Sequence, residues 1–121
     1  MSRVLLAEDD APLRAALREA LSWQGFEVYE AADTSEAGRH LDETSFDVVI
    51  ADIDMPGDGH SLLDRVRSTH PETPVILMTG IEEDGGRSRA HTEGAFDYLV
   101  KPINLSLLKT TIERACGQPR P

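Results

Sequence analysis

Acidic residues stand where apolar runs of this chain end. Glu8 and Asp9 follow the run at 3–7, and Asp52 closes the run at 47–52. Two like charges about 4 Å apart cost roughly 4 kcal/mol at an effective dielectric near 20. Carboxylates brought together therefore either keep protons or bind a divalent cation. All-oxygen ligands with open positions favour Mg²⁺.

A hydroxyl and an ammonium group stand at two further run ends. Thr79 closes the run at 74–79, and Lys101 follows the run at 96–100. A metal ion, a lysine and a hydroxyl together would surround a phosphoryl group, and a nearby carboxylate can attack it to form an acyl phosphate. Taken singly, each residue has an ordinary reading as a helix cap or loop start. Their joint placement favours Mg²⁺-assisted phosphoryl transfer onto an aspartate.

These residues need a scaffold that brings run ends together. The apolar runs are continuous rather than alternating, which is typical of strands covered on both faces. Stretches with helical periodicity separate them. The pattern predicts an α/β fold, a doubly wound five-stranded parallel sheet with five helices. In such sheets, ligands bind beyond the carboxyl ends of the strands. The predicted strands are 3–7, 26–31, 47–52, 74–79 and 96–100.

Capping residues predict where several helices begin. Asp10, Asp33 and Asn104 each precede a helical pattern and are suited to accept hydrogen bonds from its first turn. The segment at 81–94 fits a helix poorly, because it contains the pair Gly85-Gly86 and each interior glycine costs about 1 kcal/mol. We expect a short, late-starting or mobile helix there.

Composition narrows the class of protein. The chain has 121 residues, 40% of them hydrophobic and 28% charged, and a formal net charge of −10. We expect one domain at 1–116, with 117–121 as a tail or the start of a linker. The charge argues against direct binding of nucleic acid or an anionic membrane. The single cysteine, Cys116, excludes an internal disulfide and favours the cytoplasm. Trp23 is expected to pack at the end of the first helix.

Four motifs resemble those of response-regulator receiver domains of bacterial two-component signalling. They are VLLAEDDAPLR, DVVIADIDMPGDG, PVILMTG and GAFDYLVKP, and they occur in the family order and spacing. The resemblance covers about residues 2–116. It implies the flavodoxin-like receiver fold and a switch that takes up a phosphoryl group.

The resemblance implies a role for each acidic residue. Asp52 is the phosphoacceptor and also a metal ligand. Asp9 binds Mg²⁺ directly, Glu8 binds it directly or through water, and the main-chain carbonyl of Asp54 completes the protein's contacts. Mn²⁺ is an alternative metal. Asp54 is acidic where many members are neutral, and this charge is expected to alter metal affinity or the rate of dephosphorylation.

The same resemblance assigns the switch. Thr79 and Lys101 contact the phosphoryl oxygens, and Tyr98 is the aromatic switch residue on an output face formed by the fourth helix, fifth strand and fifth helix. The peptide bond from Lys101 to Pro102 is expected to be cis.

The implied partners follow from this role. A sensor histidine kinase or phosphotransfer protein supplies the phosphoryl group, and an output domain or downstream protein reads it. A homodimer through the output face is compatible with the pattern. The domain assists its own phosphorylation and dephosphorylation and is not a turnover enzyme.

Two other classes of function remain as alternatives. An aspartyl-phosphate hydrolase of the haloacid-dehalogenase type would use Asp52 and Asp54, but its motif normally lies on the first strand and lacks Pro56. A phosphate-independent interaction domain on the same fold is disfavoured because Glu8 and Lys101 are both present.

Overall fold

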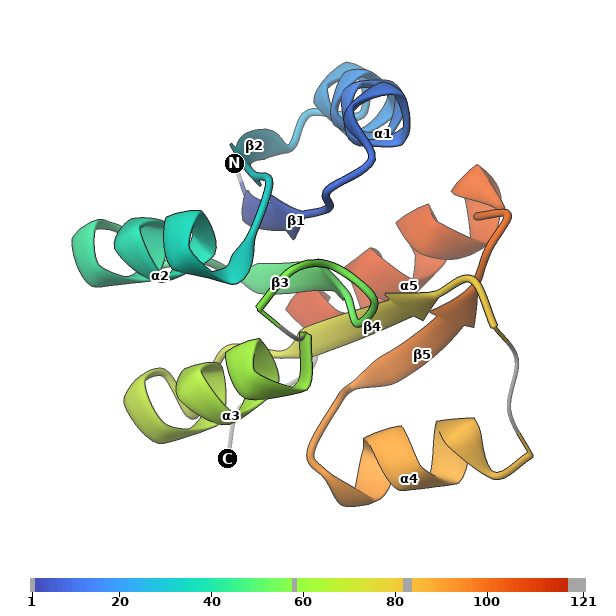
Figure 1. Cartoon of the computed structure of the whole chain (residues 1–121). Helices are drawn as coiled ribbons and strands as arrows, with labels where there is room; N and C mark the ends of the chain where they lie inside the picture. The colour runs from blue at the N-terminus through green and yellow to red at the C-terminus, as the bar shows by residue number, and fades with distance from the viewer. Residues whose placement is uncertain (1, 58, 82–83, 118–121) are drawn as a thin grey trace.

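The computed structural model describes residues 2–57, 59–81 and 84–117, in which five strands alternate with five helices (Figure 1). The elements are β1 (Arg3–Ala7), α1 (Ala11–Trp23), β2 (Glu27–Ala31), α2 (Thr34–Glu43), β3 (Val48–Asp52), α3 (Gly59–Thr69), β4 (Val75–Thr79), α4 (Gly86–Thr92), β5 (Asp97–Val100) and α5 (Leu105–Gly117). The predicted α/β class is thus confirmed. Residues 118–121 of the expected tail lie outside the described residues.

The strands form one parallel sheet in the order β2-β1-β3-β4-β5. Helices α1 and α5 cover one face, and α2, α3 and α4 cover the other (Figure 1). The chain order reverses between β1 and β3, which lie side by side. In doubly wound sheets this switch point opens the crevice where ligands bind.

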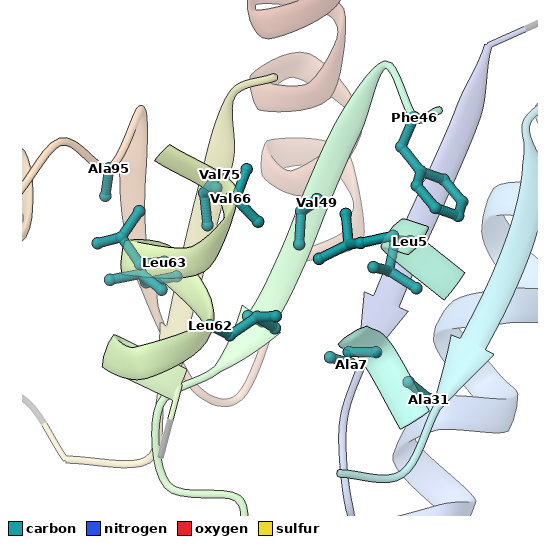
Figure 2. Packing of buried hydrophobic residues seen from close by; sticks show 14 of the residues in the cluster. Leu5, Ala7, Ala31, Phe46, Val49, Leu62, Leu63, Val66, Val75 and Ala95 are labelled. Carbon is teal, nitrogen blue, oxygen red and sulfur yellow. The ribbon is translucent and has the colours of Figure 1, made fainter. Parts of the chain in front are cut away.

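Both faces of the sheet are packed, because alternate residues of each strand point to opposite sides. On β1, Leu5 and Ala7 join one buried cluster, while Val4 and Leu6 join the other. Figure 2 shows the first cluster, in which Leu62, Leu63 and Val66 of α3 lie over the sheet. This double covering explains why the strands are continuous apolar runs.

The predicted helix starts are confirmed. The Asp10 carboxylate accepts a hydrogen bond from the Leu13 amide, and Asp33 accepts one from Glu36. Asn104 accepts one from the amide of Leu107. Each cap satisfies a first-turn N–H that has no partner within the helix.

Helix α4 is short and starts late, as the glycine pair predicts. It has 7 residues, and its cap Gly85 has a left-handed backbone with φ of 74°. The expectation for Trp23 was wrong: it is 84% exposed at the last position of α1, where it is not covered by the packing of the helix against the sheet. Across the described ranges, no helix combines the length and apolarity needed to cross a bilayer.

Candidate functional site

The parallel topology gathers the acidic residues at one edge of the sheet. Ala7 and Ala51 are paired in register, so Glu8 and Asp52, which follow them, leave β1 and β3 side by side. The carboxylates of Glu8, Asp9 and Asp52 each offer an oxygen, and these oxygens lie within 4.8 Å of one another. Glu8 and Asp52 are buried, whereas Asp9 is exposed.

Lys101 joins two of these carboxylates. Its Nζ donates to Glu8 Oε1 at 2.6 Å and to Asp52 Oδ2 at 2.8 Å. The Lys101–Pro102 peptide bond is cis, as the resemblance implied. The other Asp52 oxygen, Oδ1, accepts from the amide of Asp54 at 2.9 Å. Asp52 is thereby held from both sides while it stays at the end of β3.

Burial and charge set the protonation of this cluster. Burial, together with the facing Asp52, raises the pKa of Glu8 to about 7 even though Lys101 opposes the change. Burial would also raise the pKa of Asp52, but its hydrogen bonding with Glu8, Lys101 and the Asp54 amide lowers it below its usual value. Contacts with both carboxylates outweigh burial and raise the pKa of Lys101. Of the two carboxyl groups, Asp52 is therefore the one that stays ionised at lower pH.

The cluster has the chemistry of a Mg²⁺ site. Three carboxylates face one ammonium group, so negative charge is left uncompensated. Glu8 Oε2 is buried and has no hydrogen-bond partner among the described residues. A buried acceptor without a donor is costly, and a hard cation with oxygen ligands would satisfy it. The donors therefore fit the metal.

A second set of contacts lies on the β4 side of Asp52. Thr79 Oγ1 and the amide of Gly80 each lie 3.2 Å from the same Asp54 oxygen, Oδ2, and donate to it. Thr79 Oγ1 is also 3.3 Å from the carbonyl of Ile81 and accepts from the Ile81 amide at 3.2 Å. The buried Thr79 hydroxyl is thus oriented by its neighbours.

Tyr98 continues this line of contacts toward α4. Its ring is buried, and its hydroxyl donates to the Ile81 carbonyl at 3.4 Å. Gly86 makes room for the ring, since a Cβ there would lie 2.8 Å from the Tyr98 oxygen. The inward position of Tyr98 consequently depends on a glycine in the first turn of α4.

A family model for the response regulator receiver domain matches residues 4–113. The chain belongs to this family.

Two related response regulators are much longer than this chain. It is 42% identical over 120 residues to the response regulator protein FleR of Pseudomonas aeruginosa, covering 97% of this chain and 25% of FleR. It is 35% identical over 113 residues to the DNA-binding transcriptional regulator NtrC of Escherichia coli K12, covering 93% and 24%. The chain thus spans about a quarter of these relatives.

Solved receiver domains have the same fold. The non-phosphorylated HemR receiver domain of Leptospira biflexa superposes with a TM-score of 0.91 at 30% identity, covering 100% of this chain and 98% of that one. The hydrolase alternative is not supported, because Asp52 ends β3 rather than the first strand.

Most of these side chains lie together as the sequence pattern predicts. Glu8, Asp9, Asp52 and Lys101 converge as the strand-end rule predicts. Reasoning from the sequence assigned only the main-chain carbonyl of Asp54 a role and missed its carboxylate. The pairing of β3 with β4 brings Asp54 near the end of β4, but the spacing of residues does not determine this contact.

Proposed function

We propose that this receiver domain takes a phosphoryl group from a partner histidine kinase or phosphotransfer protein onto Asp52, in a reaction that depends on Mg²⁺, with Mn²⁺ as an alternative. The observation that carries the proposal is the anchoring of Asp52. Lys101 holds one of its oxygens and the Asp54 amide holds the other. The lowered pKa keeps this carboxylate ionised and ready to attack.

The transfer step is an in-line displacement. An Asp52 oxygen attacks the phosphorus of a phosphohistidine, the P–N bond breaks, and its electron pair stays on the imidazole nitrogen, which takes up a proton. Lys101 offsets negative charge on the oxygens of the transferred phosphoryl group. Positioning and charge stabilisation of this kind account for most of the catalysis of phosphoryl transfer by proteins. When bound at Glu8, Asp9, Asp52 and the Asp54 carbonyl, the metal supplies the further positive charge.

Hydrolysis of the acyl phosphate resets the domain. Water attacks the phosphorus, the Asp52 carboxylate leaves, and inorganic phosphate is released. The domain assists both of its own reactions and serves as a switch rather than as a turnover enzyme.

The switch acts through the β4 side of the site. A phosphoryl group adds close to two negative charges and new acceptor oxygens. Thr79 donates to one of them, and Tyr98 and α4 respond, so the population of states at the output face of α4, β5 and α5 shifts. The contacts that link Thr79 to Tyr98 through the Ile81 carbonyl support this route.

The partners and location extend the same proposal. The similarity to the DNA-binding transcriptional regulator NtrC favours an output domain that acts in transcription. We expect no direct contact between this domain and nucleic acid or a membrane. The output face is the surface through which a homodimer would form. We place the domain in the cytoplasm, where its kinase partner presents the phosphohistidine.

A small phosphodonor tests the proposal. Acetyl phosphate with Mg²⁺ is expected to add one phosphoryl group to the chain, detected by mass spectrometry as a base-labile adduct on Asp52. EDTA and Asp52→Asn should each abolish the adduct. Asp42→Asn, which removes an exposed carboxylate on α2, should leave it unchanged. An intact chain with no adduct under these conditions would overturn the proposal.

A further inference from the structure

The Asp54 carboxylate occupies a place that suits an anion. One of its oxygens, Oδ2, accepts from both the Thr79 hydroxyl and the Gly80 amide, each at 3.2 Å. These two donors stand at the end of β4, next to the end of β3 where Asp52 lies. The backbone amide of the same Asp54 is already bound to Asp52. Asp54 therefore brackets the phosphoacceptor, with its amide on Asp52 and its carboxylate on the neighbouring strand end.

We infer that the Asp54 carboxylate is an internal stand-in for the phosphoryl oxygens. It holds the donors of Thr79 and Gly80 before phosphorylation and must give them up when Asp52 carries a phosphoryl group. This inference rests on the proposed phosphorylation of Asp52, because only that reaction brings a competing anion to these donors.

Competition follows from the number of donors. A phosphoryl group on Asp52 brings three further acceptor oxygens to these donors. The Thr79 hydroxyl has one proton and cannot serve both anions. Asp54 is exposed, so its side chain is free to turn into solvent once displaced.

The stand-in has a second effect in the unphosphorylated domain. While the Thr79 proton is directed to Asp54, Tyr98 donates to the Ile81 carbonyl without a second hydroxyl donor beside it. Without Asp54, the Thr79 hydroxyl turns to the Ile81 carbonyl, 3.3 Å away. Asp54 thus orients Thr79 and, through Ile81, supports the inward position of Tyr98 before any phosphoryl group is present. It is a positioning residue in this sense.

Two substitutions separate occupancy from charge. Asp54→Ala removes both the charge and the acceptor oxygens, whereas Asp54→Asn removes the charge and keeps an acceptor oxygen in the same place. Neither changes the main-chain carbonyl proposed as a metal ligand. Each variant and the wild type is incubated with acetyl phosphate at a Mg²⁺ concentration that saturates that protein, as fixed by calorimetric titration, so that altered metal affinity does not enter the comparison.

We expect Asp54→Ala to incorporate phosphoryl groups about three- to tenfold faster than the wild type, the range set by losing one or two exposed hydrogen bonds. Asp54→Asn should stay within about twofold of the wild type, because it still occupies the donors. Equal acceleration in both variants would mean that charge alone acts and would overturn the inference. A slower or unchanged Asp54→Ala would do the same.

A measurement on the metal-free, unphosphorylated protein gives an independent test. The Gly80 amide proton resonance should move upfield in Asp54→Ala and little in Asp54→Asn, and the Tyr98 ring resonances should move in Asp54→Ala. An unchanged Gly80 resonance in Asp54→Ala would overturn the inference even when the wild type is phosphorylated normally. Failure of the wild type itself to accept a phosphoryl group would instead refute the proposed function.

Discussion

The two sides of Asp52 differ in how tightly they are held. On the β1 and β5 side, Lys101 donates to two buried carboxylates at 2.6 and 2.8 Å. On the β4 side, Thr79 and Gly80 reach an exposed carboxylate at 3.2 Å, and the contacts lead to a helix of only 7 residues. The first, which we call the closed side, consists of ion pairs to buried carboxylates. The second, the open side, has longer contacts to an exposed carboxylate.

This difference separates chemistry from signalling. Charge-assisted hydrogen bonds in a poorly solvated site are strong and fix geometry, which suits the nucleophile. Exposed hydrogen bonds and a short helix are exchanged at little cost, which suits a segment that must change state. Asp52 lies between the two sides, so its phosphorylation changes the contacts of Thr79 and Gly80 on the open side.

The largest expected effect comes from breaking the closed side. Lys101→Met leaves Glu8 and Asp52 facing each other without a cation. At pH 8, without metal, we expect the free energy of unfolding to fall by about 3–4 kcal/mol, since removing one partner of a buried ion pair strands the other charge. The free energy of unfolding of both proteins is measured by urea denaturation.

The matched control for this substitution is Lys109→Met, which removes an exposed lysine from α5. It should change the free energy of unfolding by less than about 0.5 kcal/mol. If the two variants were equally stable, the Lys101 contacts would be no stronger than surface contacts and the contrast between the two sides would fail.

A pH titration sharpens the comparison next. The pKa of Glu8 is about 7 in the folded protein and 4.5 as its ordinary value, so the folded state holds the proton more tightly. The stabilisation is therefore complete below pH 4.5 and is lost as the pH rises through 7. We expect the metal-free protein to lose about 2–3 kcal/mol of unfolding free energy between these values.

Glu8→Gln isolates this effect, because glutamine is neutral at every pH. Its unfolding free energy should change much less than that of the wild type over the same window. Asp52 affects stability in a different pH range. Its pKa in the folded protein lies below the ordinary value of 3.8, so the stability that it contributes is lost only in acid below that pH. Parallel curves for wild type and Glu8→Gln would contradict the raised pKa of Glu8.

Much of the closed side was predictable from the sequence, for a physical reason. Strand ends of a parallel sheet meet at one edge, so the order of apolar runs was enough to bring Asp52 and Lys101 together. The late start of α4 was equally predictable, because Gly85 and Gly86 weaken a helix wherever they occur.

The open side was not predictable in the same way. The contact of the Asp54 carboxylate depends on side-chain torsions at a turn, which spacing does not determine. Trp23 shows the same limit: helical periodicity places it at the end of α1, but whether anything covers that end is a matter of tertiary packing. The space that Gly86 leaves for the Tyr98 ring is likewise apparent only when α4 and β5 are packed together.

The smallest expected effect concerns how α4 is attached. Asp97 of β5 forms ion pairs with Arg87 of α4 and Arg114 of α5. Exposed ion pairs contribute at most about 1 kcal/mol, so Arg87→Ala should leave global unfolding nearly unchanged while speeding amide exchange within α4 by about threefold or less. Arg114→Ala, which removes the other partner, should leave exchange in α4 at the wild-type rate. If Arg87→Ala instead slowed exchange in α4 or lowered global stability as much as Lys101→Met, α4 would be part of the rigid core and the division between the closed side and the open side would not hold.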